Sequence, residues 1–358
     1  MSQVSLFVDD MEHFGWTSVS VRKSLQALCG HFDLSLSPNW EQMPIDWKAK
    51  PGQKCTLELS KTRVLTGFID SFSESISANS RTIRVTGRDI TSDLCDCYST
   101  SRKRTWPDAK FEAITRSLIS PYGLELDVQC DTGRVFNAFA IQDETIFSAL
   151  DRAAKLRGLI LYTNGDGEIV VTKPNIENEV QGILEEKKHI LDAEVSKDYS
   201  NRFSEYTMRI MNTGAADKDE ANLRPLAPPV LDPVIKRNRV LSISPEGYAQ
   251  AQNASQRLNW EKSVRAAKSE KITVSIPQWT NADGLPWELN KLVTLEIPSL
   301  NVIGDYLVTG ITFSLDASSG TRTTLECEKP EAYIIDPTLE IKENTRRDLI
   351  AKESKPNA

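Results

Sequence analysis

Only a few short stretches of the sequence hold side chains that could do chemistry. Asp131-Thr132-Gly133 is the tripeptide of aspartic proteases, in which two carboxylates share a proton and activate water. Those enzymes need two copies set among apolar residues, whereas here the tripeptide occurs once, between Cys130 and Arg134. Because both features are missing, the tripeptide predicts a turn between strands.

Possible metal ligands are scattered along the chain. Cys95-Asp96-Cys97 offers two thiols, but a zinc site needs four ligands, usually as two spaced pairs, and no partner pair is present. The histidines form no H-x-x-x-H or H-E-x-x-H motif and lie far apart, at His13, His31 and His189. The run from Asn164 to Glu168 resembles a calcium loop without its closing acid, so it predicts a hairpin turn.

Other motifs of catalysis are also missing. The sequence has no P-loop, no G-x-G-x-x-G and no G-x-S-x-G. Carboxylate pairs can still assemble from distant residues, and 50 acidic residues are available. The sequence therefore predicts no catalytic, cofactor-binding or metal-binding residues, and it favours a structural or binding role.

Composition limits the class of protein further. The 358 residues are 39% hydrophobic and 26% charged, which is typical of a folded chain of two or three domains. The net charge of −7 argues against a large nucleic-acid-binding face, and the short run Arg102-Lys103-Arg104 is expected to be a solvated loop. The sequence has no apolar run of membrane-spanning length and no visible signal peptide. The six cysteines are expected to be reduced core thiols.

The elements that would position any site are mostly β-strands, and one set of strands occurs twice. The stretch VLTGFIDSFSESISANSRTIRVTGRDI, residues 64–90, resembles LVTGITFSLDASSGTRTTLECEK, residues 307–329. Aligning Thr66-Gly67 with Thr309-Gly310 makes the preceding connection five residues longer in the second copy and the following hairpin loop one residue shorter. Differences confined to turns predict two related domains, because a slip within a strand would reverse its buried face.

The segment between the two copies has a different pattern. Two amphipathic helices are predicted, each closed by a glycine, Gly123 or Gly158, and followed by an apolar strand. In the second helix Asp143 is the expected cap, and the buried face is expected to hold Ile146, Leu150 and Ala153. This segment is predicted to be an α+β insert.

The predicted fold is mixed α+β and β-rich, with two similar antiparallel β-barrel domains and the insert between them. We predict a short helix at 25–29, a proline-rich connector at 214–239 without a core, and a helix at 245–268 opened by Ser244-Pro245. The predicted parts are a first β-barrel domain at 1–91, the insert at 92–186, a second β-barrel domain at 187–330 that includes the long helix, and a charged tail at 331–358.

An ordered set of motifs resembles a known family. GWTSVSVRKSLQALCGHFDLSLSPNW, PGQKCTLELSKTRVLTGFIDSFSE and TGRDITSDLCDCYS are similar to the N-terminal signature of baseplate hub proteins, tail protein D type, of Mu-like contractile-tailed phages and prophages. The resemblance extends from about residue 4 to about residue 330. It rests on the order of the motifs, chiefly Thr-Gly-Phe-Ile-Asp followed by Gly-Arg-Asp.

The resemblance implies a structural role and no catalytic residues. Hubs of this family form homotrimers in which each chain supplies two similar β-barrels, so a threefold ring has six near-equivalent units. Such a ring would join the tail tube to a separate central spike, contact other baseplate proteins and surround a channel through which DNA passes without specific binding. The protein would be part of the virion tail baseplate and would be assembled in the cytoplasm of the bacterial host.

Two alternatives remain open at the level of sequence. The first is the hub of a related contractile injection or secretion system, which shares the fold. The second is a glycan-binding protein or hydrolase, which would use a cleft of paired acids and tryptophans, for which the candidates are Trp106, Trp260, Trp279 and Trp287. The sequence by itself gives neither the stoichiometry, the spike, the pore width, the order of the tail after Glu331, nor whether a prophage that carries it is functional.

Overall fold

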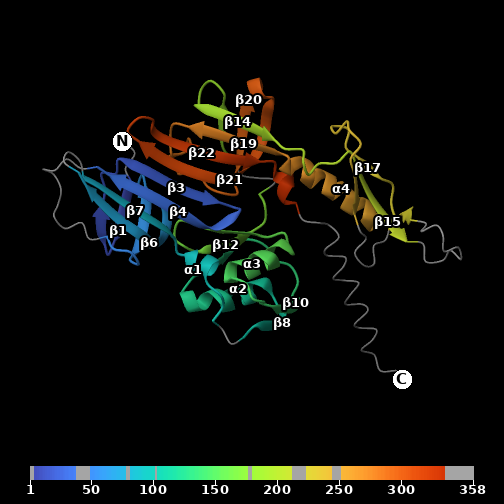
Figure 1. Ribbon diagram of the computed structural model, residues 1–358, viewed down its shortest axis with the longest axis horizontal. Helices are drawn as coiled ribbons and strands as arrows, with labels where there is room; N and C mark the ends of the chain where they lie inside the picture. The colour runs from blue at the N-terminus through green and yellow to red at the C-terminus, as the bar shows by residue number, and fades with distance from the viewer. Residues whose placement is uncertain are drawn as a thin grey trace. The chain divides into compact units, whose positions relative to one another are not determined.

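The computed structural model describes residues 4–37, 49–77, 81–100, 103–175, 180–211, 223–243 and 251–334. Two compact units divide the chain: unit 1 holds Met1–Val195 and Ile272–Glu328, and unit 2 holds Ser196–Lys271 and Lys329–Ala358. Strands dominate the described residues, and helices are few (Figure 1). The predicted mixed α+β, β-rich class is therefore confirmed.

The first β region of unit 1 is an antiparallel sheet at the N-terminal end of the chain (Figure 1). Its strands are β1 (Val4–Val8), β2 (Met11–His13), β3 (Ser18–Ser24), β4 (Ala27–Leu36), β5 (Lys54–Leu59), β6 (Thr62–Ile76) and β7 (Arg81–Asp89). They are ordered β3-β4-β7-β6-β5-β1-β2 in the sheet. Side chains alternate between the two faces of each strand, so Val19 and Val21 point into the core together with Phe32 and Leu34 of the next strand.

The second β region of unit 1 has the same kind of strand order. Its strands are β13 (Val180–Glu185), β14 (Asp192–Lys197), β19 (Glu270–Ile276), β20 (Leu292–Ile297), β21 (Val302–Asp316) and β22 (Gly320–Glu328). The order is β14-β19-β22-β21, with β20 beside β21 and β13 beside β20. Thus β14, β19, β22, β21 and β20 take the places of β3, β4, β7, β6 and β5. The next strand differs in direction, because β13 runs parallel to β20 whereas β1 runs antiparallel to β5.

Details of the pairing confirm the internal repeat. Strands β6 and β21 are both 15 residues long, and each has a bulge against its hairpin partner, between Ile69 and Ser71 in β6 and between Val308 and Gly310 in β21. The hydrogen bonds just before β3 and β14 also match. Thr17 N–H donates to Ser35 O at 2.8 Å, and Leu191 N–H donates to Ser275 O at 2.8 Å. A bulge re-aims a strand, so a shared bulge means a shared bend.

The residue alignment predicted for the repeat is wrong in its register. Cys55 pairs with Gly67, whereas Val293 pairs with Tyr306, so Tyr306 and not Gly310 is the counterpart of Gly67. The connection before the long strand has two residues in the first copy, 60–61, and four in the second, 298–301, so it is two residues longer and not five. The two Thr-Gly pairs therefore occupy different positions along β6 and β21. Strand pairing, and not residue identity, fixes the register.

The two β regions join into one continuous sheet. Strand β21 leaves β20 after Leu307 and then pairs antiparallel with β3, from Gly310 opposite Ser24 to Leu315 opposite Val19 (Figure 1). One hydrophobic core accordingly includes residues of both regions, for example Phe32 and Phe313. The closure of each region into a barrel stays a prediction.

The predicted insert forms an α+β layer with its own core. Its elements are α1 (Ser92–Asp96), β8 (Thr105–Ala109), α2 (Phe111–Ile119), the 3-10 helix η1 (Ser120–Tyr122), β9 (Leu126–Val128), β10 (Phe136–Ala140), α3 (Ile146–Lys155), β11 (Ile160–Thr163) and β12 (Ile169–Thr172). Both predicted helix ends are confirmed, because Gly123 and Gly158 have φ of 65° and 58°. The predicted cap is wrong: Thr145 and not Asp143 caps α3, with its Oγ1 accepting from Ser148 N–H at 3.2 Å.

Two further predictions for unit 1 need correction. The helix predicted at 25–29 is a tight turn that leads into β4, which starts at Ala27. Strand pairing prevails there because Leu28 is buried among insert residues while Phe32, further along β4, is buried in the core of the sheet. The sequence interpretation also missed β1 and β2, which extend the sheet beyond β5.

Unit 2 is a small α+β assembly. Its elements are β15 (Glu205–Met211), β16 (Leu223–Pro225), β17 (Val230–Leu231), β18 (Val240–Ile243), α4 (Ala251–Lys268) and the 3-10 helix η3 (Pro330–Tyr333); another 3-10 helix, η2 (Pro298–Leu300), belongs to unit 1. Helix α4 ends where predicted, and its predicted start at Ser244 lies outside the described residues. The proline-rich connector is not without a core, since Ala227 is buried with Tyr206 and Leu258.

Candidate functional site

The Gly-Arg-Asp motif of the sequence lies where the first β region meets the insert. Asp89, the last residue of β7, is 2% exposed. Its carboxylate accepts from Gly30 N–H at 2.5 Å, from Thr91 N–H at 2.9 Å and from the Thr91 hydroxyl at 2.5 Å. Burial raises the pKa of Asp89, and the hydrogen bonds from Thr91 and Gly30 oppose that shift. The carboxylate is therefore committed to holding β4 and the start of α1 together.

The other two residues of the motif serve the same junction. The Arg88 guanidinium bonds to Asp70 on β6 and to Asp96 in α1, both at 2.8 Å, and these bonds raise the pKa of Arg88. Gly87 lies against Phe32, whose ring would come within 2.5 Å of an added Cβ. The motif that carries the family resemblance is thus an architectural one, which joins a β region to the insert.

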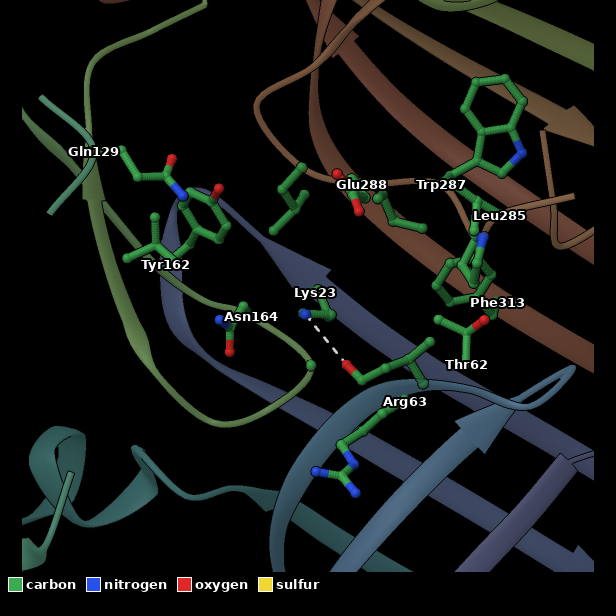
Figure 2. A pocket seen from close by; sticks show the side chains of 16 residues that line it. Lys23, Thr62, Arg63, Gln129, Tyr162, Asn164, Leu285, Trp287, Glu288 and Phe313 are labelled. Atoms are coloured by element: carbon green, nitrogen blue, oxygen red, sulfur yellow. Dashed lines mark hydrogen bonds between the residues drawn. The ribbon is translucent and has the colours of Figure 1, made fainter. Parts of the chain in front are cut away.

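A cavity of about 260 Å³ opens where both β regions and the insert converge (Figure 2). Lys23 and Arg63 come from the first β region, Gln129, Tyr162 and Asn164 come from the insert, and 285–289 with Phe313 come from the second β region. Figure 2 shows Lys23 near the middle of this lining, between the insert side and the Phe313 side.

Lys23 is the central polar group of the cavity. Its Nζ donates to the main-chain oxygen of Val64 at 3.2 Å (Figure 2). Burial lowers the pKa of Lys23, and the charges of Asp89 and Glu288 partly offset this effect. Burial also raises the pKa of Tyr162 to about 12, so the phenol stays protonated at neutral pH. The polar side chains of the lining can hold a small polar group.

Of the sequence candidates for metal or acid–base chemistry, the run from Asn164 to Glu168 contributes Asn164 and Gly165 to this cavity, and the others do not line it. Asp131-Thr132-Gly133 lies between β9 and β10, as predicted, and Gly133 N–H donates to Asp131 Oδ1 at 3.0 Å. His13 is buried in β2, and the other two histidines, His31 and His189, are exposed. No group of three or more potential ligands that could hold a metal ion occurs among the described residues.

The hairpin turn and the cysteines largely follow the predictions. Residues 164–168 connect β11 and β12 as a turn, in which Asn164 Oδ1 accepts from Asp166 and Glu168 N–H, both at 3.0 Å. All six cysteines are free; Cys55 and Cys327 are buried. Cys97 is exposed and is therefore not the core thiol that was predicted.

The tryptophans proposed for a glycan cleft are packing residues. Trp106, Trp279 and Trp287 are buried, with exposed fractions of 2%, 2% and 5%. The Trp279 indole N–H lies 3.0 Å from Ser314 O and 3.1 Å from Arg322 O. Trp260 on α4 donates to Ile334 O at 2.7 Å. The three buried rings offer no open aromatic face to a sugar, although Trp287 also lines the cavity, and Trp260 is partly buried. Among the described residues, no helix is long and apolar enough to span a bilayer.

Comparisons with known proteins match this architecture. The model of the Mu phage baseplate assembly protein GpP-like N-terminal domain matches residues 3–89, and that of the baseplate hub protein gp44-like second domain matches 91–173. The model of the GpP fourth domain matches 250–336. The first two matches meet at the Asp89 junction.

Relatives and solved structures agree with the family models. The baseplate hub protein gp44 of Escherichia phage Mu is 30% identical over 343 residues, which cover 93% of this chain and 89% of gp44. The crystal structure of the 43 kDa tail protein of prophage MuSo2 from Shewanella oneidensis has a TM-score of 0.80 at 27% identity and covers 93% of this chain and 99% of that one. An E. coli type VI secretion component, c3393, has a TM-score of 0.58 at 10% identity and covers 90% and 76%, which is a likeness of fold.

The duplicated β region, the insert and these matches define the class of protein as a structural hub of a phage tail baseplate, not an enzyme. Within that class, the chain belongs to the family of the phage Mu baseplate hub protein gp44.

Proposed function

We propose that the protein forms a homotrimeric ring in the tail baseplate, which joins the tail tube to a separate central spike. The single observation that supports this proposal is the repeat within unit 1, where two β regions of the same strand order lie in one sheet. Three such chains present six near-equivalent units, so one ring can contact a sixfold tube on one side and a threefold spike on the other. Closed rings follow when the same head-to-tail contact is repeated around an axis.

The ring would contact other baseplate proteins and surround the channel through which DNA passes. The net charge of −7 supports passage without adhesion, because a surface of like charge does not retain a polyanion. We place the mature protein in the virion and its assembly in the cytoplasm of the host. The four-part division at 1–91, 92–186, 187–330 and 331–358 remains part of this proposal.

The test is a solution mass measurement by analytical ultracentrifugation, combined with negative-stain images of the purified full chain. We expect a mass of three chains and ring-shaped particles with a central opening. A monomer that persists at the highest attainable concentration would contradict the trimer.

The alternative of a hub in a contractile secretion system is supported by likeness of fold alone, for example to c3393. Purification from phage particles or from a secretion apparatus would separate the two. A glycan-binding role has no support in the buried tryptophans, and a clear hit on a glycan array would be needed to revive it.

A further inference from the structure

Two cysteines lie on opposite sides of the Gly-Arg-Asp junction. Cys29 is in β4 of the first β region and Cys95 is in α1 of the insert, and both are free and partly buried. Helix α1 packs against β4 (Figure 1). The residue before each cysteine, Leu28 or Leu94, is buried in the same core, that of the insert. The backbone that carries each thiol is therefore anchored in one shared core.

The Asp89 carboxylate brings the two cysteines together. It accepts from Gly30 N–H, next to Cys29, and from Thr91 N–H, at the start of α1. Cys95 lies one helical turn beyond Thr91, and its N–H donates to Thr91 O at 3.3 Å. Each cysteine is thus within one helical turn of an N–H group that binds the same carboxylate.

The two thiols are in contact. The side chains of Cys29 and Cys95 are hydrogen-bonded to each other, and Cys95 Sγ also accepts from Cys29 N–H. Cys29 Sγ lies 3.4 Å from Gly30 O, which is a second acceptor for its single proton. A disulfide needs two sulfur atoms that can approach to about 2 Å on side chains that face each other, and these two already face each other.

The surroundings favour Cys95 as the thiolate of the pair. The hydrogen bond from Cys29 lowers the pKa of Cys95, although burial opposes this shift. The charges of Asp89 and Asp96 oppose it as well. The same hydrogen bond raises the pKa of Cys29, as does burial, and the charge of Arg88 acts in the other direction. Because the thiolate is the nucleophile in thiol–disulfide exchange, Cys95 is the thiol that reacts first.

We propose that Cys29 and Cys95 form a reversible disulfide, which joins the first β region covalently to the insert when the protein meets a low-molecular-weight disulfide such as oxidised glutathione. The Cys95 thiolate attacks one sulfur of oxidised glutathione, the S–S bond of the reagent breaks, and one glutathione leaves as its thiolate. Cys29 then gives up its proton and attacks Cys95 Sγ, and the second glutathione leaves. Two protein thiols are thereby oxidised, and one oxidised glutathione is reduced to two thiols.

The disulfide would strengthen the junction outside a reducing compartment. In a reducing cytosol the pair should stay as two thiols, and in an oxidising medium the disulfide should persist. The bond would close the loop from 29 to 95 and restrict the unfolded chain, which stabilises the folded state. This inference does not depend on the proposed ring, because both cysteines belong to one chain.

Peptide mapping tests the pairing. The reduced full chain is incubated with oxidised glutathione at about pH 8, the remaining thiols are blocked with N-ethylmaleimide in urea, and the protein is digested with trypsin without reductant. Trypsin leaves Cys29 in peptide 24–48 and Cys95 in peptide 89–102, and we expect these two peptides to be linked. Reductant should separate them. Peptide 89–102 also contains Cys97, so the experiment is repeated with Cys97→Ser.

Matched variants test the order of the two steps. In the Cys97→Ser background, Cys29→Ser should retain one glutathione on Cys95, because the second thiol is missing. Cys95→Ser should leave Cys29 largely unmodified, because the thiol that reacts first is missing. Circular dichroism should show the same fold in all variants. A Cys97→Ser protein that keeps both thiols reduced in a large excess of oxidised glutathione would overturn the inference, as would a link that forms only when Cys97 is present.

Thermal unfolding measures what the bond does to the junction. The oxidised Cys97→Ser protein should unfold at a temperature about 5 °C higher than the same protein after reduction. The variant that also carries Cys29→Ser should show no such difference. A disulfide that forms without raising the unfolding temperature would overturn its stabilising role. A mass measurement that finds no trimer would contradict the proposed function and leave this inference standing.

Discussion

Close backbone approach governs the Gly-Arg-Asp junction at the residue scale. A Cβ on Gly67 would lie 1.9 Å from the main-chain oxygen of Arg88, and the nearest atoms are all backbone. Only glycine fits there. Gly67 lies on β6, directly opposite Asp89 on β7. The junction therefore depends on a residue that contributes no side chain.

We predict that Gly67→Ala lowers the free energy of unfolding by about 2 kcal/mol or more, because backbone atoms must move to admit the methyl group. Urea denaturation of the full chain, followed by tryptophan fluorescence, measures the change. Gly182→Ala is the matched control, since its nearest neighbour is the side chain of Trp287 at 3.3 Å, which can yield. Equal losses in the two variants would contradict the argument.

Thiol reactivity should follow burial. Burial raises the pKa of Cys55 to about 12, and it also raises the pKa of Cys327, whereas Cys97 is exposed. Because the thiolate is the reactive form, iodoacetamide at about pH 8 should label Cys97 first and leave the two buried thiols unmodified until the protein unfolds. Peptide mass spectrometry measures the order of labelling. Early modification of Cys55 in the folded protein would show that the core opens.

At the element scale, the start of α3 shows that two neighbouring residues can each be a candidate for the helix N-cap. Asp143 and Thr145 are both good capping residues, but the structure uses Thr145 for α3. Glu144 then bonds to Arg152 at 2.6 Å, which ties the entry of the helix to its last turns. The hydrogen bond from Arg152 and the charge of its guanidinium lower the pKa of Glu144.

We predict that Thr145→Ala destabilises the protein by about 1 kcal/mol, because Ser148 N–H loses its acceptor. Asp143→Ala should change stability by less than about 0.5 kcal/mol, as a surface substitution that removes no cap. Thermal unfolding of both variants by circular dichroism gives the comparison. A larger loss of stability in Asp143→Ala than in Thr145→Ala would mean that Asp143 is the cap, as the sequence predicted.

Some features of the fold could be predicted from sequence and others could not. Period-two alternation gave β4, β5 and β7, helical periodicity gave the buried face of α3, and Asn-Gly-Asp-Gly gave the β11–β12 turn, because each is a local pattern. The register of the repeat, the turn at 25–26 and the core contact of Ala227 depend on partners distant in the chain. The hydrogen bonds of Asp89 could not be foreseen either, since Gly30 lies on a distant strand, although the Gly-Arg-Asp motif marked the position.

Two compact units make up the whole molecule, and each has its own core. Unit 2 contains a buried ion pair, with Arg202 Nε 2.6 Å from Asp232 and side chains that are 12% and 1% exposed. Despite burial of the carboxylate, bonds from Arg202 and Val234 lower the pKa of Asp232. The pair is therefore ionised at neutral pH. Because it is buried, its hydrogen-bond partners must come from the protein and not from water.

We predict that Arg202→Ala destabilises unit 2 by about 3–5 kcal/mol, because Asp232 is left buried without its counter-charge. Hydrogen exchange read by mass spectrometry should speed up in β15 and stay unchanged in β4. Lys197→Ala, which removes an exposed pair with Glu270, is the control and should cost about 0–1 kcal/mol. Faster exchange throughout unit 1 in the Arg202 variant would mean that the units do not unfold independently.

The β21–β3 junction has a mechanical consequence. Its hydrogen bonds lie across two antiparallel strands, so a pull along the strand axis loads all of them at the same time instead of one after another. In an optical trap, handles at Ser18 and Gly310, which lie at opposite ends of the pair, load the bonds in this way. Rupture should then require a much larger force than with handles at Ser18 and Asp316, which lie across from each other and peel the strands apart from one end. A tail hub built in this way would transmit tension from one half of the chain to the other without relying on side-chain contacts alone.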